Sequence, residues 1–154
     1  MKNILSNKYL LLLSRVILGL VFVIASVDKI AVPEVFALNV QAYKVLPLPL
    51  VNIMALIIPW VELLCGIFLI SKTYVRSSSI LLSALLCIFI IMLASAITRG
   101  LTIDCGCFGA SHSSPVSWSR VLEDIGLLLL GVHILYFSER VVKLNTGEIT
   151  AISS

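Results

Sequence analysis

The chain has 154 residues, of which 60% are hydrophobic and only 12% are charged, and its mean hydropathy is +1.12. A soluble domain of this size has too much surface for its volume to bury so many apolar side chains. The composition therefore excludes a soluble domain and indicates a single membrane domain covering residues 1–154. The net charge of +3 comes from 11 Lys and Arg scattered among 8 Asp and Glu, which argues against a nucleic-acid partner.

Four apolar runs are each long enough to cross the hydrocarbon core, which takes about 20 residues of helix. Lipid cannot satisfy an open backbone, so the spans must be helical. A cleaved signal peptide is the alternative for the first run, but Arg15 interrupts that run, which is also longer than a usual signal core. We therefore predict an all-α integral membrane four-helix bundle with spans at about 9–27, 50–70, 80–97 and 116–137.

Two ionisable residues, Arg15 and Glu62, lie within the first and second runs. Charges inside a membrane are costly and usually face a partner or a cavity. At 1.5 Å per residue, Arg15 lies about 9 Å and Glu62 about 12 Å from the same membrane surface. We therefore predict an intramembrane pair between them, which is either purely structural or part of a proton path or quinone pocket.

The first connection, residues 28–49, is too long for a tight turn, and its apolar residues alternate with polar ones. This pattern predicts a short amphipathic helix lying in the membrane interface between the first two spans. Pro33 suits the first turn of that helix, and the segment Leu46-Pro47-Leu48-Pro49 should stop it before the second span.

Basic residues flank the spans unevenly, and the positive-inside rule converts that asymmetry into an orientation. The more basic side holds Lys2, Lys8, Lys72, Arg76, Arg140 and Lys143. Both termini are therefore predicted to be cytoplasmic. The first and third connections are then predicted to lie outside the cytoplasm of a bacterial inner membrane.

The third connection carries the one close cysteine pair, Cys105 and Cys107, separated by a glycine. The third helix should end at Arg99-Gly100 with glycine as its cap, and the fourth should restart at Ser114-Pro115. Two thiols one residue apart can close a small, strained disulfide that is easily reduced and can cycle in an oxidising compartment. A permanent structural bond and binding of a soft metal such as Cu(I) remain open alternatives.

Charged residues near this connection could tune the thiols. A nearby cation such as Arg99 would stabilise a thiolate, and the negative charge of Asp104 would oppose it. We expect a polar cluster at this end of the bundle, which could move protons during exchange or be ordinary interface charge. Its members would be Asp28, Lys29, Arg99, Arg120 and one of the adjacent pair Glu123 and Asp124.

Several segments together resemble the DoxX-like membrane proteins. They are Arg15-Val-Ile-Leu-Gly-Leu-Val-Phe22, Asp28-Lys29, Phe36, Tyr43, Pro47, Pro59 and Glu62. The segment Asp104-Cys-Gly-Cys-Phe-Gly109 narrows the resemblance to the MauE branch, which is linked to maturation of a disulfide-rich periplasmic dehydrogenase subunit. The resemblance implies that Cys105 and Cys107 are a redox pair.

We therefore interpret the chain as a membrane thiol–disulfide oxidoreductase acting on an extracytoplasmic thioredoxin-like or disulfide-containing protein. A non-catalytic assembly factor that anchors such a protein is the alternative. The chain has no second external cysteine pair, which argues against an autonomous relay to quinone. No resident metal is predicted, and the only candidate cofactor is a quinone bound near Glu62 and Trp60.

Overall fold

The computed structural model describes residues 8–45, 47–101, 103 and 117–152, and from residue 139 onward it describes only the course of the helix. These residues form five helices, which bear out the all-α prediction. The helices are α2 (Lys8–Ala31), α3 (Pro33–Ala42), α4 (Leu48–Ile70), α5 (Val75–Thr98) and α6 (Trp118–Ile152).

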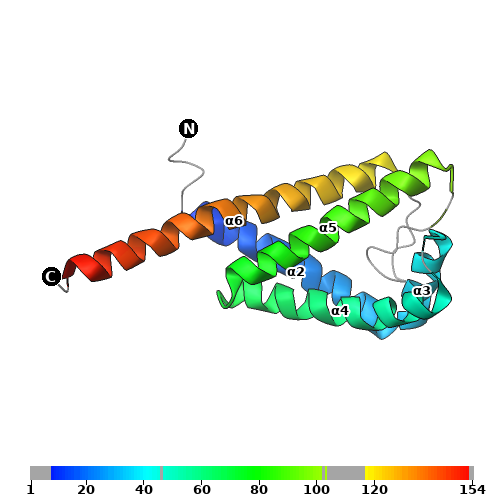
Figure 1. The fold of residues 1–154 in the computed structure, drawn as a ribbon, viewed down its shortest axis with the longest axis horizontal. Coiled ribbons are helices and arrows are strands. Elements are labelled where there is room, and N and C mark those ends of the chain that lie inside the picture. Colours follow the sequence, from blue (N-terminus) through cyan, green and yellow to red (C-terminus); the bar gives the residue numbers. More distant parts are fainter. Residues whose placement is uncertain (1–7, 46, 102, 104–116, 153–154) are drawn as a thin grey trace.

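The four long helices form two antiparallel pairs, α2 with α4 and α5 with α6 (Figure 1). The ribbons of the two pairs come together near the short connection between α4 and α5, which we call the turn end. They separate toward the opposite end, where α3 lies and where α2 and α5 finish and α4 and α6 begin. We call this the α3 end.

Each long helix contains a stretch long and apolar enough to cross a membrane, as predicted. The four stretches are Tyr9–Ala31, Leu48–Ile70, Val75–Thr98 and Trp118–Ser138. The third helix begins at Val75, five residues earlier than its apolar run, and the first continues past Asp28 and Lys29. A helix runs on through polar residues near its ends because its backbone groups still need hydrogen bonds.

The predicted short helix between the first two spans is α3, which begins with Pro33 in its first turn. Proline is favoured there because an unpaired N–H is expected at that position and the ring fixes a helical φ. Phe36 of α3 is 4% exposed, so the helix is packed against the bundle. Pro47 caps α4, and Pro49 lies in its first turn, so these prolines open the second span.

The C-terminus of α5 is fixed by the predicted glycine cap. Gly100 has φ of +66°, in the left-handed region that glycine tolerates best. The N–H of Leu101 donates to the carbonyl of Ala96 and that of Gly100 to the carbonyl of Ile97, each at 3.0 Å. This pair of bonds is a Schellman motif, which stops the helix and sets the direction in which the chain leaves it.

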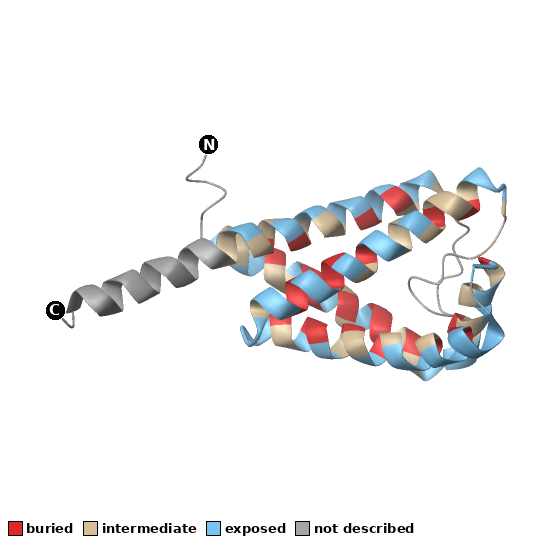
Figure 2. Cartoon of the chain, in the orientation of Figure 1, coloured by how far each residue is buried: buried red, intermediate tan, exposed pale blue. Residues whose placement is uncertain are grey.

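Buried and exposed residues alternate along each long helix (Figure 2), and large apolar residues are found among both. Leu18, Leu69, Leu82 and Ile134 are fully buried between the helices. Many other large apolar residues on the long helices are more than half exposed, among them Trp60 at 52%. A continuous apolar exterior of this kind needs lipid around it, because water would disfavour so large a patch.

Candidate functional site

The predicted redox residues Cys105 and Cys107, and their neighbour Asp104, lie outside the described residues. They belong to the connection between α5 and α6, and α5 ends and α6 begins at the α3 end (Figure 1). The other two cysteines lie within the spans, as the sequence indicated: Cys65 is buried in α4 and Cys87 is exposed on α5.

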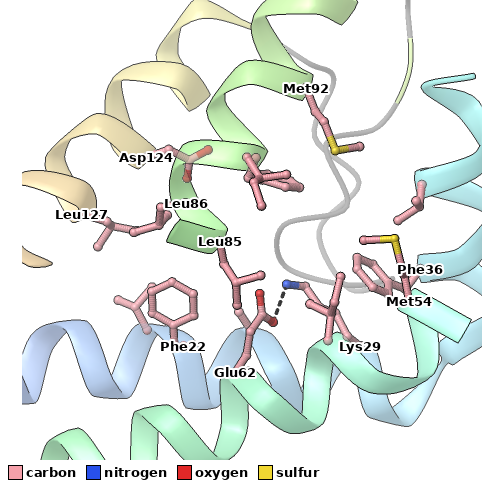
Figure 3. A pocket seen from close by; sticks show the side chains of 16 residues that line it. Phe22, Lys29, Phe36, Met54, Glu62, Leu85, Leu86, Met92, Asp124 and Leu127 are labelled. Atoms are coloured by element: carbon pink, nitrogen blue, oxygen red, sulfur yellow. Dashed lines mark hydrogen bonds and ion pairs between the residues drawn. The ribbon is translucent and has the colours of Figure 1, made fainter. Parts of the chain in front are cut away.

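A buried ion pair joins α2 to α4 toward the α3 end. Lys29 Nζ lies 2.7 Å from Glu62 Oε2, and the two side chains are only 6% and 8% exposed (Figure 3). The ammonium also lies 5.1 Å from the centre of the Phe36 ring, a favourable cation–π distance. The pair therefore neutralises two charges that would each be expensive to bury alone.

The predicted pair between Arg15 and Glu62 is wrong. Arg15 instead donates from Nε and Nη2 to the carbonyl oxygen of Leu69, at 3.2 and 2.8 Å. The close packing of Gly19 on Gly66 sets the relative depth of α2 and α4. Arg15 lies about one turn from this crossing toward the turn end, and Glu62 lies about one turn toward the α3 end, so the two residues differ in depth by roughly 11 Å.

Side-chain direction explains why Lys29 reaches Glu62 when Arg15 does not. Side chains on a helix lean toward its N-terminus, and α2 and α4 are antiparallel. Lys29 on α2 therefore leans toward the turn end, and Glu62 on α4 leans toward the α3 end, so their side chains approach each other. Arg15 leans the same way as Lys29, which takes it away from Glu62 and toward the last turn of α4.

The two adjacent carboxylates at the start of α6 face different surroundings. Glu123 accepts a hydrogen bond from Arg120 Nη1 at 2.6 Å on the surface, where the Glu123 side chain is 56% exposed. Asp124 is only 8% exposed, and its Oδ2 has no hydrogen-bond partner among the described residues. The helical rotation of about 100° between neighbours places one carboxylate outward and the other inward.

Arg99 and Tyr43 connect α5 to the end of α3. Arg99 Nη1 donates to the backbone carbonyl of Tyr43 at 3.1 Å, and the Tyr43 residue is 2% exposed. Burial and the nearby charge of Asp124 raise the pKa of the Tyr43 hydroxyl to about 12. Tyr43 is therefore neutral at any physiological pH.

The predicted members of the polar cluster differ in burial and in hydrogen-bond partners. Lys29 is buried and paired with Glu62, and Asp124 is buried on α6. The Arg120–Glu123 pair lies on the surface, and Arg99 binds the Tyr43 carbonyl. Asp28 is half-buried near the end of α2. Adjacent residues such as Glu123 and Asp124 differ in this way because they point to different faces of a helix.

A cavity of about 110 Å³ lies among the helices on the α3 side of the core (Figure 3). Its lining comes from all five helices and is mostly apolar, with Phe22 and Phe36 among its aromatic residues. Lys29, Glu62 and Asp124 supply its charged groups. Trp60, expected beside Glu62, does not line the cavity and lies exposed on the outer face of α4.

The sequence identified Glu62 and Asp124 as candidates but did not predict that they face one cavity. Lys29 was assigned to the interface, since it follows the first apolar run directly. The length of the lysine side chain and its lean toward the helix N-terminus were the signals that could have located its partner. No group of three or more His, Cys, Asp or Glu that could hold a metal ion is found within the described ranges.

Comparison with known proteins identifies the family. Residues 7–137 match the family of the methylamine utilisation protein MauE. The chain is 36% identical over 121 residues to the methylamine utilization protein MauE of Paracoccus denitrificans, a match covering 78% of this chain and 65% of that protein. The corresponding protein of Methylorubrum extorquens is 31% identical over 116 residues, covering 75% of this chain and 62% of that protein.

The protein of the same name from Methylophilus methylotrophus is 30% identical over 136 residues, covering 87% of this chain and 72% of that protein. The chain thus spans slightly less than two thirds of the length of the first two relatives. No solved structure matches the chain. These matches support the predicted MauE branch and leave the wider DoxX-like relationship as a resemblance. The chain belongs to the MauE family.

Proposed function

We propose that this protein is a membrane accessory factor of methylamine utilisation. In this proposal it exchanges disulfides through Cys105 and Cys107 with a thioredoxin-like or disulfide-containing protein outside the cytoplasm. The names of its relatives support the accessory role, and its four apolar spans support the membrane setting. The exchange chemistry rests on one observation, the cysteine pair in the connection between α5 and α6.

Chain connectivity supports placing this pair at the α3 end. Cys105 follows Ile103 by two residues in the sequence, shortly after the end of α5. The Schellman motif at Gly100 fixes the point from which the connection starts. By the positive-inside rule, this end of the bundle faces away from the cytoplasm, where a disulfide can persist.

The observed contacts indicate which cation is available to favour the thiolate form of the cysteines. Lys29 is paired with Glu62 inside the bundle, and Arg120 is paired with Glu123. Arg99 binds a neutral carbonyl, so its charge is not balanced by that contact. Arg99, on the α5 side of the connection, is therefore the cation best placed to favour a thiolate over a thiol.

In the oxidising direction, a thiolate of the partner attacks one sulfur of the Cys105–Cys107 disulfide and displaces the other as a thiolate. This forms a mixed disulfide between the two proteins. A second thiolate of the partner then attacks the mixed bond. The partner leaves with a disulfide, and Cys105 and Cys107 are left as two thiols. The reverse sequence would reduce the partner through the same intermediate.

Trapping of the mixed disulfide tests this proposal. Cys105→Ala and Cys107→Ala each leave one thiol of the pair, which should capture the partner as a covalent adduct in intact membranes, visible on non-reducing gels. Cys87→Ala is the matched control and should capture nothing, since it keeps both members of the pair. If neither single variant yields an adduct, exchange through this pair is ruled out as the function.

The reduction potential of the pair separates exchange from a purely structural bond. A potential close to those of thioredoxin-like proteins supports exchange. A potential below about −300 mV marks a bond that partners cannot reduce and would instead support an assembly factor with a structural disulfide.

A further inference from the structure

The turn end of the bundle carries cations that the described side chains do not neutralise. Arg15 and Lys72 both lie toward this end, and neither forms an ion pair with a described residue. The acidic residues whose side chains the structure describes all lie on the α3 side of the contact between Gly19 and Gly66. They are Asp28, Glu34, Glu62, Glu123 and Asp124. The described part of the chain therefore leaves the turn end with unbalanced positive charge.

Arg15 is held against the last turn of α4. Its Nε and Nη2 donate to the carbonyl oxygen of Leu69, and α4 ends one residue later at Ile70. This contact uses two of the five donor protons of a guanidinium, and the others have no acceptor among the described residues. A charge within a membrane span is costly without a counter-charge, and a long basic side chain near the end of a span extends its head group toward the lipid phosphates.

Lys72 places a second cation in the short turn between α4 and α5, three residues after Leu69. Its φ of +61° is in the left-handed region, and the N–H of Thr73 donates to the carbonyl of Phe68 at 3.1 Å across the turn. This hydrogen bond fixes the backbone that carries Lys72, and the residue itself is exposed. An exposed cation therefore lies just beyond the carbonyl that holds Arg15.

Exposed apolar side chains lie beside the two cations. Leu12, one turn before Arg15 on α2, is 42% exposed, and Ile70 at the end of α4 is 36% exposed. Tyr74 in the same turn as Lys72 is 71% exposed, and tyrosine favours the level of the lipid head groups. A molecule that matches this surface has an anionic group joined to apolar chains.

We propose that Arg15 and Lys72 bind the phosphate of an anionic phospholipid in the leaflet at the turn end. The acyl chains lie along the exposed apolar residues beside them. The head group of phosphatidylglycerol adds no positive charge and fits this site. That of phosphatidylethanolamine carries an ammonium, which two neighbouring cations repel. The site uses neither cysteine of the proposed function, so the two proposals can fail separately.

Native mass spectrometry of the full chain, released from detergent micelles, tests the site with dioleoyl phosphatidylglycerol and dioleoyl phosphatidylethanolamine as probes. We expect one tightly bound phosphatidylglycerol per chain and weaker binding of phosphatidylethanolamine. A basic residue near a membrane surface contributes about 1 kcal/mol to binding of anionic lipid, which corresponds to about a fivefold change in affinity. Arg15→Gln should therefore bind phosphatidylglycerol about fivefold more weakly.

Two lysines with the same backbone conformation provide a matched pair of variants. Lys44 follows α3 with φ of +52°, in the left-handed region like Lys72, but it lies at the α3 end. Glycine is the residue that tolerates this conformation best, so Lys72→Gly and Lys44→Gly should both be at least as stable as the wild type in thermal unfolding. Lys72→Gly should lose about fivefold in affinity for phosphatidylglycerol, and Lys44→Gly should lose none.

Competition separates a lipid site from a site for free phosphate. Glycerol phosphate carries the phosphate of the lipid without its acyl chains, and a large excess of it should not displace phosphatidylglycerol. The proposal is overturned by such displacement, by equal affinity for the two lipids, or by unchanged affinity in Arg15→Gln or Lys72→Gly. An equal loss in Lys44→Gly also overturns it. If Arg15→Gln does not fold, the comparison of the two lysine variants decides alone.

Discussion

The two ends of the bundle are built on different principles. Toward the turn end, the helices meet through fully buried leucines and the crossing of Gly19 on Gly66, where an added Cβ would lie 2.9 Å from a backbone oxygen. Toward the α3 end, the two helix pairs separate around a cavity that contains a buried ion pair and an unpartnered carboxyl oxygen. A second buried cluster of Tyr43, Leu93, Ala96 and Val121 also packs the α3 end, so what distinguishes the two ends is the buried charge gathered beside the cavity.

Breaking the ion pair should have the largest effect. Glu62→Leu leaves the Lys29 ammonium buried without a counter-charge and should cost about 3–5 kcal/mol of folding free energy. The double variant Lys29→Met with Glu62→Leu should recover most of that loss, because both charges are gone. Equilibrium unfolding in mixed detergent micelles measures all three proteins. Equal stability of the single and double variants would show that the pair is not coupled.

A substitution at the contact of Gly19 with Gly66 tests the packing of α2 on α4 toward the turn end. Gly66→Ala places a Cβ 2.9 Å from the Gly19 carbonyl oxygen and from a Val23 methyl group, so α2 and α4 must move apart. We expect a loss of about 1–3 kcal/mol, typical of overpacking. Gly126→Ala on α6 is the control: no atom lies within 4 Å of the new methyl group, and alanine favours a helix by up to about 1 kcal/mol. A Gly66→Ala protein as stable as Gly126→Ala would contradict the close crossing.

Tyr43 gives the α3 end a pH dependence of its own. Its pKa is raised to about 12 from an ordinary value near 10, so the folded state holds the phenol proton more tightly than the unfolded state does. The resulting stability is fully present below pH 10 and is lost as the pH rises toward 12, by roughly 2 kcal/mol in total. Tyr43→Phe should show a flatter stability curve between pH 10 and 12. Parallel curves for the two proteins over that interval would contradict it.

The sequence predicted the architecture more completely than the site, for a physical reason. Four spans, the α3 helix with Pro33 in its first turn and the cap at Gly100 follow from hydropathy and local backbone preferences. The partners of Arg15 and Glu62 depend on the register between two helices. That register is set by the Gly19–Gly66 contact, which no local pattern reveals. Depths counted from the ends of apolar runs assumed that the helices begin and end level with one another.

Asp124 tests whether a buried carboxylate lowers the stability of the α3 end. Leucine at this position should raise the free energy of unfolding by about 1 kcal/mol and so stabilise the protein. The reason is that it removes a buried carboxyl oxygen that has no hydrogen-bond partner among the described residues. Leucine in place of the outward-facing Glu123 should change stability by much less. A less stable Asp124→Leu protein would mean that the carboxylate stabilises the bundle. Residues at both ends would then contribute to stability.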